Sequence, residues 1–501
     1  MAAKDATSTL PLQPTKPSGL RSALQYTGIP PSWFEKRPKL PSRNWLIFIS
    51  VTASITGYYL YDRRECKRIR QEYVDRVKHL AEAPLGTMEL PRKVTVYGGK
   101  WPGDDDYDRS MKYFRKYVKP ILVAAAVDYD MIKGKRLGDI SNHVAESIKT
   151  RRRIDAGLEP LPSLATPAVQ KRTPEQELEG GIVLIGRSTF KEFMHGLVRG
   201  WTEGLEKVDR EEQLANELAN DGAFDEPDTE SLASTTSRPL ADDEPIPTPS
   251  RLAPSRVLPG TLAQFKMPGM TQASPSSSII SVTSSIPAHL NAPPESIPPL
   301  PPLLLVSFTN FVGLKLIPHM IWDFFNERYK VASGSRDGYK LVMGITRPFL
   351  APPPSLNAPA FDPSIDPVQD LRPQLDLDFD RDVESYYKNS LQKIPSEIES
   401  SRKSYYKSLA EKLVTARALA RGDREPTKEE LQNPPPTEVE LRAERIKKEL
   451  RWRGDLEGWE IVKPENQTLW DERLRGVLKV FVDPPEDGAL PSSDDKTETR
   501  A

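Results

Sequence analysis

The chain has 501 residues, and its 70 Lys and Arg residues nearly balance its 71 Asp and Glu residues, which leaves a net charge of −1. This balance argues against a nucleic-acid-binding protein, because such proteins normally carry a basic excess. The single cysteine, Cys66, excludes an internal disulfide framework and a cysteine-based zinc site, and the five histidines lack the spacing of metal ligands.

Residues 1–44 form a basic, proline-rich tail, with seven Lys and Arg residues against two acids. That composition is typical of an organellar targeting segment. Because prolines from Pro11 to Pro41 prevent a long amphipathic helix, we expect an uncleaved tail and not a cleaved transit peptide.

An uncharged run of seventeen residues, 45–61, follows the tail. As a helix it is about 25 Å long, the short end of what crosses a hydrocarbon core, so it predicts a single N-terminal transmembrane helix. A buried soluble helix is the alternative, because Ser50, Thr52, Ser54 and Thr56 dilute the hydrophobicity. The residues expected to form the membrane anchor are Trp45, Leu46, Ile47, Phe48, Ile49, Ile55, Tyr58, Tyr59, Leu60 and Tyr61.

Residues 62–82 predict a charged helix with an apolar stripe of Ile69, Tyr73, Val77 and Leu80 at helical spacing. Its basic residues next to the predicted span can contact anionic lipid headgroups or another subunit. An equally weighted alternative is that this helix is solvated and contacts neither. The residues expected to make the contact are Arg63, Arg64, Lys67, Arg68 and Arg70.

Alternating strand and helix patterns over 90–210 predict a large α/β domain with a parallel sheet. The expected strands are 93–97, 127–132 and 181–185, and the expected helices are 113–125, bent by Pro120, then 140–153 and 189–198. Residues 222–302 are rich in proline and serine and predict a disordered insertion. The globular sequence resumes at 303–347, with a core strand from Leu303, a helix over 320–328 and another strand over 341–345.

A second linker is expected over 348–380, followed by a helical, Trp-containing C-terminal region over 381–482 and a flexible tail over 483–501. Pro395 predicts a break in the first long helix of that region. Thr427 with Glu430 and Thr437 with Glu440 match capping boxes, and the second predicts a helix to about Trp452.

The segment 182–197 has the pattern of a phosphate-binding turn, an apolar strand followed by a glycine and a helix. It resembles the nucleotide-binding turn of diacylglycerol and sphingosine kinases, in which Gly-Gly-Asp-Gly-Thr follows the strand. The corresponding residues here are Ile185, Gly186, Arg187, Ser188 and Thr189. Since only Gly186 retains the glycine pattern, the resemblance implies a degenerate diacylglycerol-kinase-like fold. Arg187 at the helix start is compatible with an anion-binding site, but a purely structural turn is the favoured interpretation. We assign no catalytic residue, no cofactor and no metal.

The segments PSWFEKRPKLPSRNW, YDRR, YVKPILVAAAVDYD, LPPLLLVSFTNFVGLKLIPHMIWDFFNER, DLDFDRDVESYYK, VTARALARGDREPTKEE and TEVELRAERIKKELRWRGDLEGWEIV are similar to those of a known family. The chain resembles the fungal fifty-four-kilodalton subunit of the mitochondrial inner-membrane carrier translocase. This resemblance implies a matrix N-terminus, a C-terminal domain in the intermembrane space and a role in inserting multi-spanning carrier proteins. The implied partners are the channel-forming subunit, small hexameric intermembrane-space chaperones, carrier precursors in transit and inner-membrane lipids, with no nucleic acid.

Charge alone gives the opposite orientation, since four basic residues precede the uncharged run and seven follow it within about twenty residues. We give the family resemblance priority over this count. The favoured function is therefore a non-enzymatic scaffold that docks chaperones near the channel. The alternatives are a membrane-anchored lipid kinase and an assembly factor for an inner-membrane protease.

Overall fold

The computed structural model describes residues 42–84, 86, 90–159, 174–207, 209–224, 286–352 and 375–485. The predictions for the N-terminal tail, for most of the insertion and the second linker, and for nearly all of the C-terminal tail lie outside these ranges. Residues 286–302, at the end of the predicted insertion, pack on the body instead: Ile297 is buried, and the Asn291 side chain accepts a hydrogen bond from Leu205 N.

The body is built on a six-stranded sheet of order β2-β1-β3-β4-β6-β5. The strands are β1 Lys93–Gly98, β2 Asp128–Lys133, β3 Ile182–Ile185, β4 Leu303–Val306, β5 Thr346–Pro348 and β6 Lys479–Phe481. All neighbouring pairs are parallel except β5 with β6. The central strands β3 and β4 are wholly apolar, as expected for strands buried on both faces. Pro348 is tolerated because β5 lies at the edge of the sheet.

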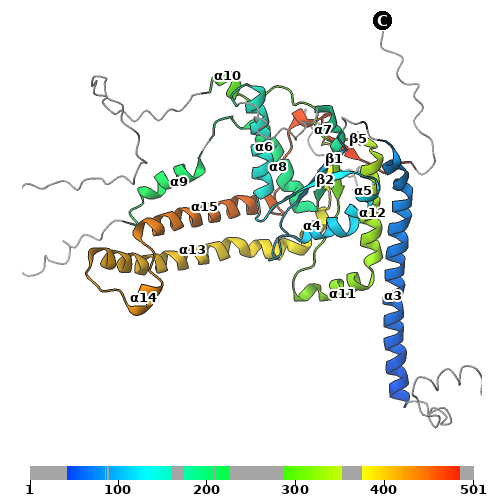
Figure 1. Cartoon of the computed structure of the whole chain (residues 1–501), viewed down its shortest axis with the longest axis horizontal. Coiled ribbons are helices and arrows are strands. Elements are labelled where there is room, and N and C mark those ends of the chain that lie inside the picture. The colour runs from blue at the N-terminus through cyan, green and yellow to red at the C-terminus, as the bar shows by residue number, and fades with distance from the viewer. Residues whose placement is uncertain are drawn as a thin grey trace, which may run out of the picture.

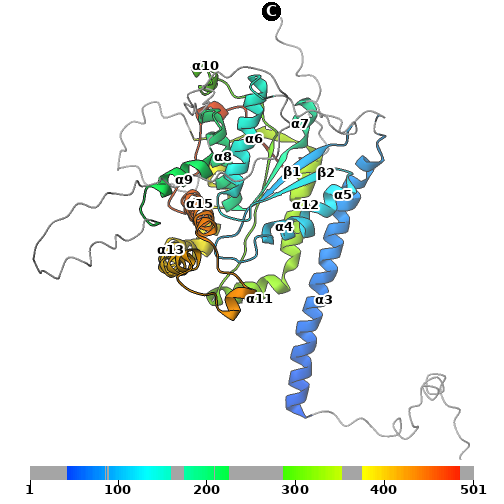
Figure 2. The same cartoon turned by 60° about the vertical axis from the view of Figure 1, so that its left-hand side comes forward.

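Helices cover both faces of the sheet (Figures 1 and 2). The α-helices are α3 Arg43–Val77, α4 Arg109–Tyr113, α5 Lys119–Ala124, α6 Asp139–Asp155, α7 Pro174–Gly180, α8 Arg187–Thr202, α9 Arg210–Ala219, α10 Ala288–Asn291, α11 Ile317–Phe325, α12 Glu327–Met343, α13 Glu384–Arg421, α14 Lys428–Gln432 and α15 Glu438–Val462. Helices α3, α5 and α12 pack together on one side, and α6 packs on α8 on the other. An α/β sheet is therefore observed, but it is mixed and not wholly parallel as expected, because β5 at its edge runs antiparallel to β6.

Helices α13 and α15 run side by side as an arm that extends away from the sheet (Figure 1). Tyr405, Leu409 and Leu413 of α13 form the arm's own core with Leu441 and Trp452 of α15. The predicted capping box at the start of α15 is confirmed, because Thr437 and Glu440 each accept the other's backbone N–H. The arm joins the body near the start of α13 and the end of α15, where Tyr387, Leu391 and Val462 enter the core on one face of the sheet.

The predicted break at Pro395 is wrong, since α13 is continuous through it. A proline removes the N–H that the carbonyl four residues earlier would accept, which here is that of Leu391. Trp459 of α15 replaces the missing donor, with its indole Nε1 2.8 Å from Leu391 O. The expected division at Pro120 is observed: a π-helical turn, Phe114–Val118, separates α4 from α5.

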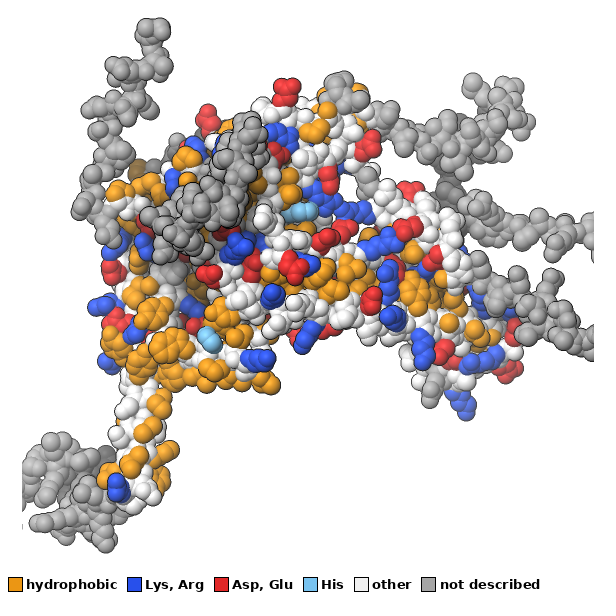
Figure 3. All heavy atoms as spheres, turned by 180° about the vertical axis from the view of Figure 1, so that it is seen from behind, with side chains coloured by type: hydrophobic (Ala, Val, Ile, Leu, Met, Phe, Trp, Pro, Cys, Tyr) orange, Lys and Arg blue, Asp and Glu red, His pale blue; other side chains and the backbone are white. Residues whose placement is uncertain are grey.

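The prediction of a transmembrane helix over 45–61 is wrong. Within the described ranges, no helix combines the length and the apolar character that crossing a bilayer requires. The run is instead the first half of α3, a helix of 35 residues in which hydroxyl side chains interrupt the apolar ones and charges begin at Asp62. Of the predicted anchor residues, Tyr59 is half-buried and the others are exposed. Figure 3 shows this half of α3 protruding from the body.

The second half of α3 packs along α12, and Asp62 joins the two helices. The Asp62 side chain is fully buried and accepts hydrogen bonds from Glu327 N at 3.1 Å and Arg328 N at 3.3 Å. These are first-turn N–H groups of α12, for which a helix has no internal acceptor. A carboxylate of one helix thus caps its neighbour.

The five predicted contact residues of α3 separate into two groups. Arg63 forms an ion pair with the carboxylate of Glu327, and Arg70 donates to Lys116 O at 3.4 Å, so these two cations serve internal contacts. Arg64, Lys67 and Arg68 are exposed. The exposed three remain candidates for a lipid or subunit contact.

Candidate functional site

The strand order changes direction between β1 and β3, because β2 lies on one side of β1 and β3 on the other. In doubly wound α/β folds, ligands bind at the carboxyl ends of the two strands that meet at such a point. Here β1 ends in Gly98 and is followed by Gly99, and β3 is followed by Gly186. The predicted nucleotide turn therefore lies where the fold would hold a ligand.

Gly186 makes the turn between β3 and α8 with a φ of +80° and a ψ of 164°, a conformation that only glycine adopts readily. A Cβ at this position would lie 3.3 Å from Cβ of Phe308. The Gly186 N–H donates to Val306 O of β4 at 2.9 Å. The turn is thus closed against the neighbouring strand.

Side chains of the protein satisfy the backbone of the facing β1 loop. The Gly99 N–H donates to Thr189 Oγ1 at 2.8 Å, and the Gly99 carbonyl accepts from Ser110 Oγ at 3.0 Å. In a phosphate-binding turn, free backbone N–H groups point at the ligand. This N–H is already paired within the protein.

Two buried cations follow the turn, and both contact the same carboxylate. Arg187 is 3% exposed and its Nε lies 2.7 Å from Glu384 Oε1. Lys191 is 2% exposed and its Nζ lies 2.7 Å from the same oxygen. Burial lowers the pKa of the Lys191 amine, and the hydrogen bond that Lys191 donates to Glu384 opposes this shift. The cations that would neutralise a phosphate are thus paired with the first residue of α13.

Backbone carbonyls complete the cluster. Arg187 Nη1 donates to Leu377 O at 2.5 Å and to Phe379 O at 3.1 Å, and Lys191 Nζ donates to Lys463 O at 3.0 Å. These carbonyls lie just before α13 and just after α15. We call Arg187, Lys191 and Glu384 the crevice cluster. This cluster fastens the base of the arm, which is the start of α13 and the end of α15, to the sheet.

Glu192 connects α8 to the start of α6. It is fully buried, and its carboxylate accepts hydrogen bonds from Ile140 N at 3.2 Å and from Gly138 N. Burial raises the pKa of this carboxyl from its ordinary 4.5 to about 8. The Glu192 side chain is therefore mostly protonated at neutral pH.

This raised pKa predicts a pH dependence of stability. A proton bound more tightly in the folded chain stabilises it fully below pH 4.5, and this contribution is lost as the pH rises to about 8. The slope reaches at most about 1.4 kcal/mol for each pH unit. We expect Glu192→Gln to flatten the change in unfolding free energy between pH 5 and pH 8, measured by urea titration. A wild-type and a variant curve that stay parallel over this range would contradict the assignment.

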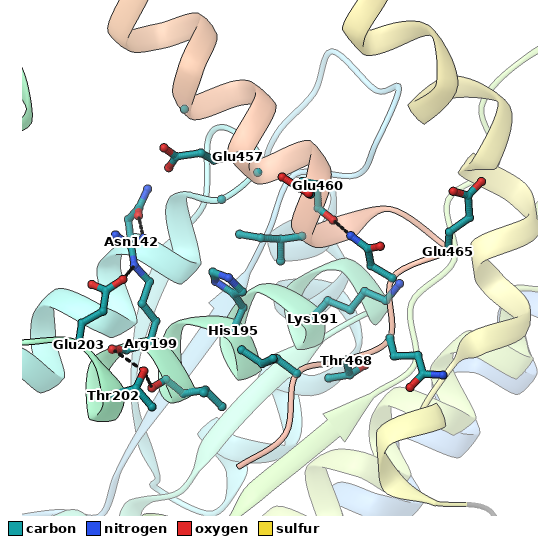
Figure 4. Close-up of a pocket in the computed structure, with 18 of the residues that line it drawn as sticks. Asn142, Lys191, His195, Arg199, Thr202, Glu203, Glu457, Glu460, Glu465 and Thr468 are labelled. Atoms are coloured by element: carbon teal, nitrogen blue, oxygen red, sulfur yellow. Dashed lines mark hydrogen bonds and ion pairs between the residues drawn. The ribbon is translucent and has the colours of Figure 1, made fainter. Parts of the chain in front are cut away.

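A hollow of about 770 Å³ lies beside the crevice cluster, between α8, the start of α6 and the end of α15 (Figure 4). Lys191, His195 and Arg199 line it from α8, and Glu457 and Glu460 line it from α15. Arg199 donates to Glu203 Oε1 at 2.6 Å and to Asn142 Oδ1 at 2.8 Å, so its charge is already neutralised.

The histidine in this hollow, His195, lies in surroundings that disfavour its charged form. Its Nδ1 lies 2.8 Å from Ser141 Oγ, and burial lowers the pKa of the His195 imidazole. Ser141 is fully buried and does not line the hollow, so this pair does not present a nucleophile to it. The hollow is a gap at the base of the arm.

Sequence patterns placed Gly186, Arg187 and Thr189 at one turn, and the structure brings them together there. They did not indicate Lys191 or Glu384. Arg187 and Glu384 are 197 residues apart, so no local spacing connects them. The available signal was a charged residue at the centre of an otherwise apolar strand-turn-helix segment, which requires a partner when buried.

The chain matches a family model described as inner membrane protein import complex subunit Tim54 over residues 21–412. A protein of Cryptococcus neoformans var. neoformans serotype D, named mitochondrial import inner membrane translocase subunit TIM54, is 40% identical over 484 residues, or 93% of this chain and 95% of that protein. The equally named protein of Yarrowia lipolytica is 43% identical over 162 residues, which cover 32% of this chain and 27% of that protein. That of Aspergillus oryzae is 40% identical over 179 residues, or 34% of this chain and 40% of its own length.

Proposed function

The chain belongs to the Tim54 family of inner-membrane protein import complex subunits, and from this premise we propose that it acts as a non-enzymatic scaffold. It is a subunit of the mitochondrial inner-membrane import translocase. The proposal concerns what the subunit contributes to that complex. It presents a rigid body and a projecting arm to the other components.

The observation that supports this proposal most is that the polar groups at the carboxyl ends of β1 and β3 are already paired within the protein. A kinase of this architecture needs free N–H groups and cations at the carboxyl ends of β1 and β3 to hold the phosphates of its nucleotide. Here the Gly99 N–H donates to Thr189, and Arg187 and Lys191 both form ion pairs with Glu384. The residues that would bind a ligand instead hold the arm.

The arm suits a scaffold because its base, the start of α13 and the end of α15, is fixed while its length extends from the sheet (Figure 1). The crevice cluster fastens α13, and Lys191 also contacts the carbonyl that follows α15. Within the arm, Glu449 is fully buried and accepts from Arg402 and from Tyr406 Oη. Such fixed geometry lets one subunit hold two others at a constant separation.

We assign as partners the channel-forming subunit and the small hexameric chaperones of the intermembrane space, as the family resemblance implies. The driving force for inserting a carrier then comes from the membrane potential acting on its charged segments, about 2.3 kcal/mol per charge per 100 mV. The scaffold contributes only the relative positions of the channel-forming subunit and the chaperones.

The test combines isolation of the complex with an activity assay. A tagged chain purified from mitochondria in mild detergent is expected to carry the channel-forming subunit in fixed stoichiometry and to crosslink to the chaperones. The same preparation is expected to phosphorylate diacylglycerol no faster with ATP than a mock purification does. Turnover that follows the chain through purification would refute the scaffold role in favour of a lipid kinase. A membrane protease in place of the channel subunit would favour the assembly factor.

We also propose that the body and arm face the intermembrane space. Protease added to mitochondria with an opened outer membrane is then expected to degrade the chain from the C-terminal side. Intact mitochondria are the control, and they should protect it. Full protection after the outer membrane is opened would contradict this orientation.

A further inference from the structure

Helix α11 exposes an apolar stripe to the outside of the molecule. Ile317, Met320, Ile321 and Phe324 recur at the spacing that normally faces a core, yet they are between 42% and 54% exposed. Trp322 beside them is 65% exposed, and no residue of α11 is buried. A helix with this pattern has its partner outside the described chain.

The stripe cannot turn inward, because neighbouring elements fix α11 on its other side. The ring centroids of Phe325 and Tyr58 of α3 lie 6.4 Å apart, and those of His319 and Phe311 lie 5.3 Å apart. Phe324, at the end of the stripe, stacks on Tyr59 with centroids 5.5 Å apart. At the end of the helix, Tyr58 Oη donates to Asn326 Oδ1 at 2.5 Å. The outward orientation of the stripe is therefore a fixed property of the fold.

The stripe lies at the base of the body, in the angle between the body and the protruding half of α3. Figure 1 shows α11 lying across the direction of α3, and Figure 3 shows hydrophobic side chains as a continuous band along that lower edge. A hydrophobic band exposed along one edge of the body can lie against a flat layer.

The charges around α11 favour an anionic layer. The acid of α11 and the acid that opens α12 are neutralised, since Asp323 pairs with Lys330 at 2.6 Å and Glu327 pairs with Arg63 and Lys116. Lys315 in the turn before α11 and Arg64 and Lys67 on α3 are exposed. Exposed cations thus precede α11 and lie on the neighbouring helix α3, whereas Asp323 and Glu327 are paired.

We propose that α11 lies in the headgroup region of an anionic phospholipid bilayer, with Ile317, Met320, Ile321 and Phe324 toward the acyl chains. Apolar side chains on one face with cations at the margin are the features of helices that lie in a membrane interface. Trp322 belongs at this level because its ring is apolar and its indole N–H remains in the headgroup layer. The inference uses the inner-membrane location of the complex and does not depend on the scaffold role.

The first test places a photo-crosslinking amino acid at position 322 in the full chain within isolated inner membranes. Position 123 is the matched control, because Val123 of α5 is also an exposed apolar residue, at 57%, but lies away from the stripe. Crosslinks to radiolabelled phospholipid are expected at 322 and not at 123. Crosslinks at 322 to a protein alone, or to neither, would overturn the proposal.

The second test measures binding of the purified full chain to vesicles of phosphatidylcholine and phosphatidylglycerol. The double variant Ile321→Glu, Trp322→Glu is expected to bind roughly tenfold or more weakly, because two large apolar side chains no longer enter the layer. Val123→Glu is expected to bind like the wild type, and α3 contributes equally in all three. Lys315→Glu should weaken binding to these vesicles and leave binding to pure phosphatidylcholine unchanged. Equal binding of the double variant and the wild type would refute the assignment, provided that circular dichroism shows both folded.

Discussion

Replacing Glu384 by glutamine is expected to lower the free energy of unfolding by about 3–5 kcal/mol, because two buried cations lose the carboxylate that they share. Arg187 and Lys191 are 3% and 2% exposed, so water cannot replace the lost charge. Urea unfolding followed by circular dichroism measures the change. The variant should also lose protection of the first turn of α13 in hydrogen exchange, since the crevice cluster holds that end of the arm.

Glu399→Gln is the matched control for this prediction. Glu399 lies on the same helix and pairs with Lys403 at 3.5 Å, but the two side chains are 72% and 80% exposed. An exposed pair of this kind contributes at most about 1 kcal/mol. If Glu384→Gln destabilises the chain no more than Glu399→Gln does, the crevice cluster does not hold the arm.

Gly458→Ala is expected to displace the base of α15 from the body and to destabilise the chain by about 3 kcal/mol or more. A Cβ at this position would lie 2.0 Å from Leu137 O and 2.6 Å from Gly138 N. Both contacts are backbone atoms, and Gly138 is itself held by Glu192. Since no side-chain rotation relieves the overlap, the helix or the loop before α6 must move. Limited proteolysis of the arm, together with urea unfolding, measures the effect.

The control lies one helical turn earlier. Gly454 has no atom within 4 Å of a Cβ built on it, so Gly454→Ala adds only helix propensity. We expect this variant to be more stable than the wild type by about 0.5–1 kcal/mol. A Gly458→Ala variant as stable as Gly454→Ala would show that α15 does not approach the loop so closely.

Local patterns were sufficient where a strand or helix has one unambiguous period. The apolar runs at Ile182–Ile185 and Leu303–Val306 form central strands, and the stripe of Ile140, Val144 and Ile148 lies in α6. The patterns failed at the edge of the sheet. Residues 341–345 were expected to be a strand but end α12 with its C-cap at Gly344, and the short strands β5 and β6 were not predicted.

The error at 45–61 came from weighing the absence of charge more heavily than the hydropathy. Ser50, Thr52, Ser54 and Thr56 leave this run too polar, and lengthening it adds the polar Asn44 and then Arg43 on one side or Asp62 on the other. The crevice cluster was not predictable for a different reason. Its two cations and its carboxylate are adjacent only after the sheet and the arm have assembled, so their pairing is a property of tertiary structure.

The cap that Asp62 places on α12 has a mechanical consequence. If α3 rotated or slid along its axis, the Asp62 carboxylate would leave the N–H groups of Glu327 and Arg328 and would keep only the weak donor Cys66 Sγ of its own helix. Torque or tension applied to the protruding half of α3 is therefore transmitted to α12 and through it to the sheet. A partner that binds the protruding half of α3 therefore moves the helix and the body together.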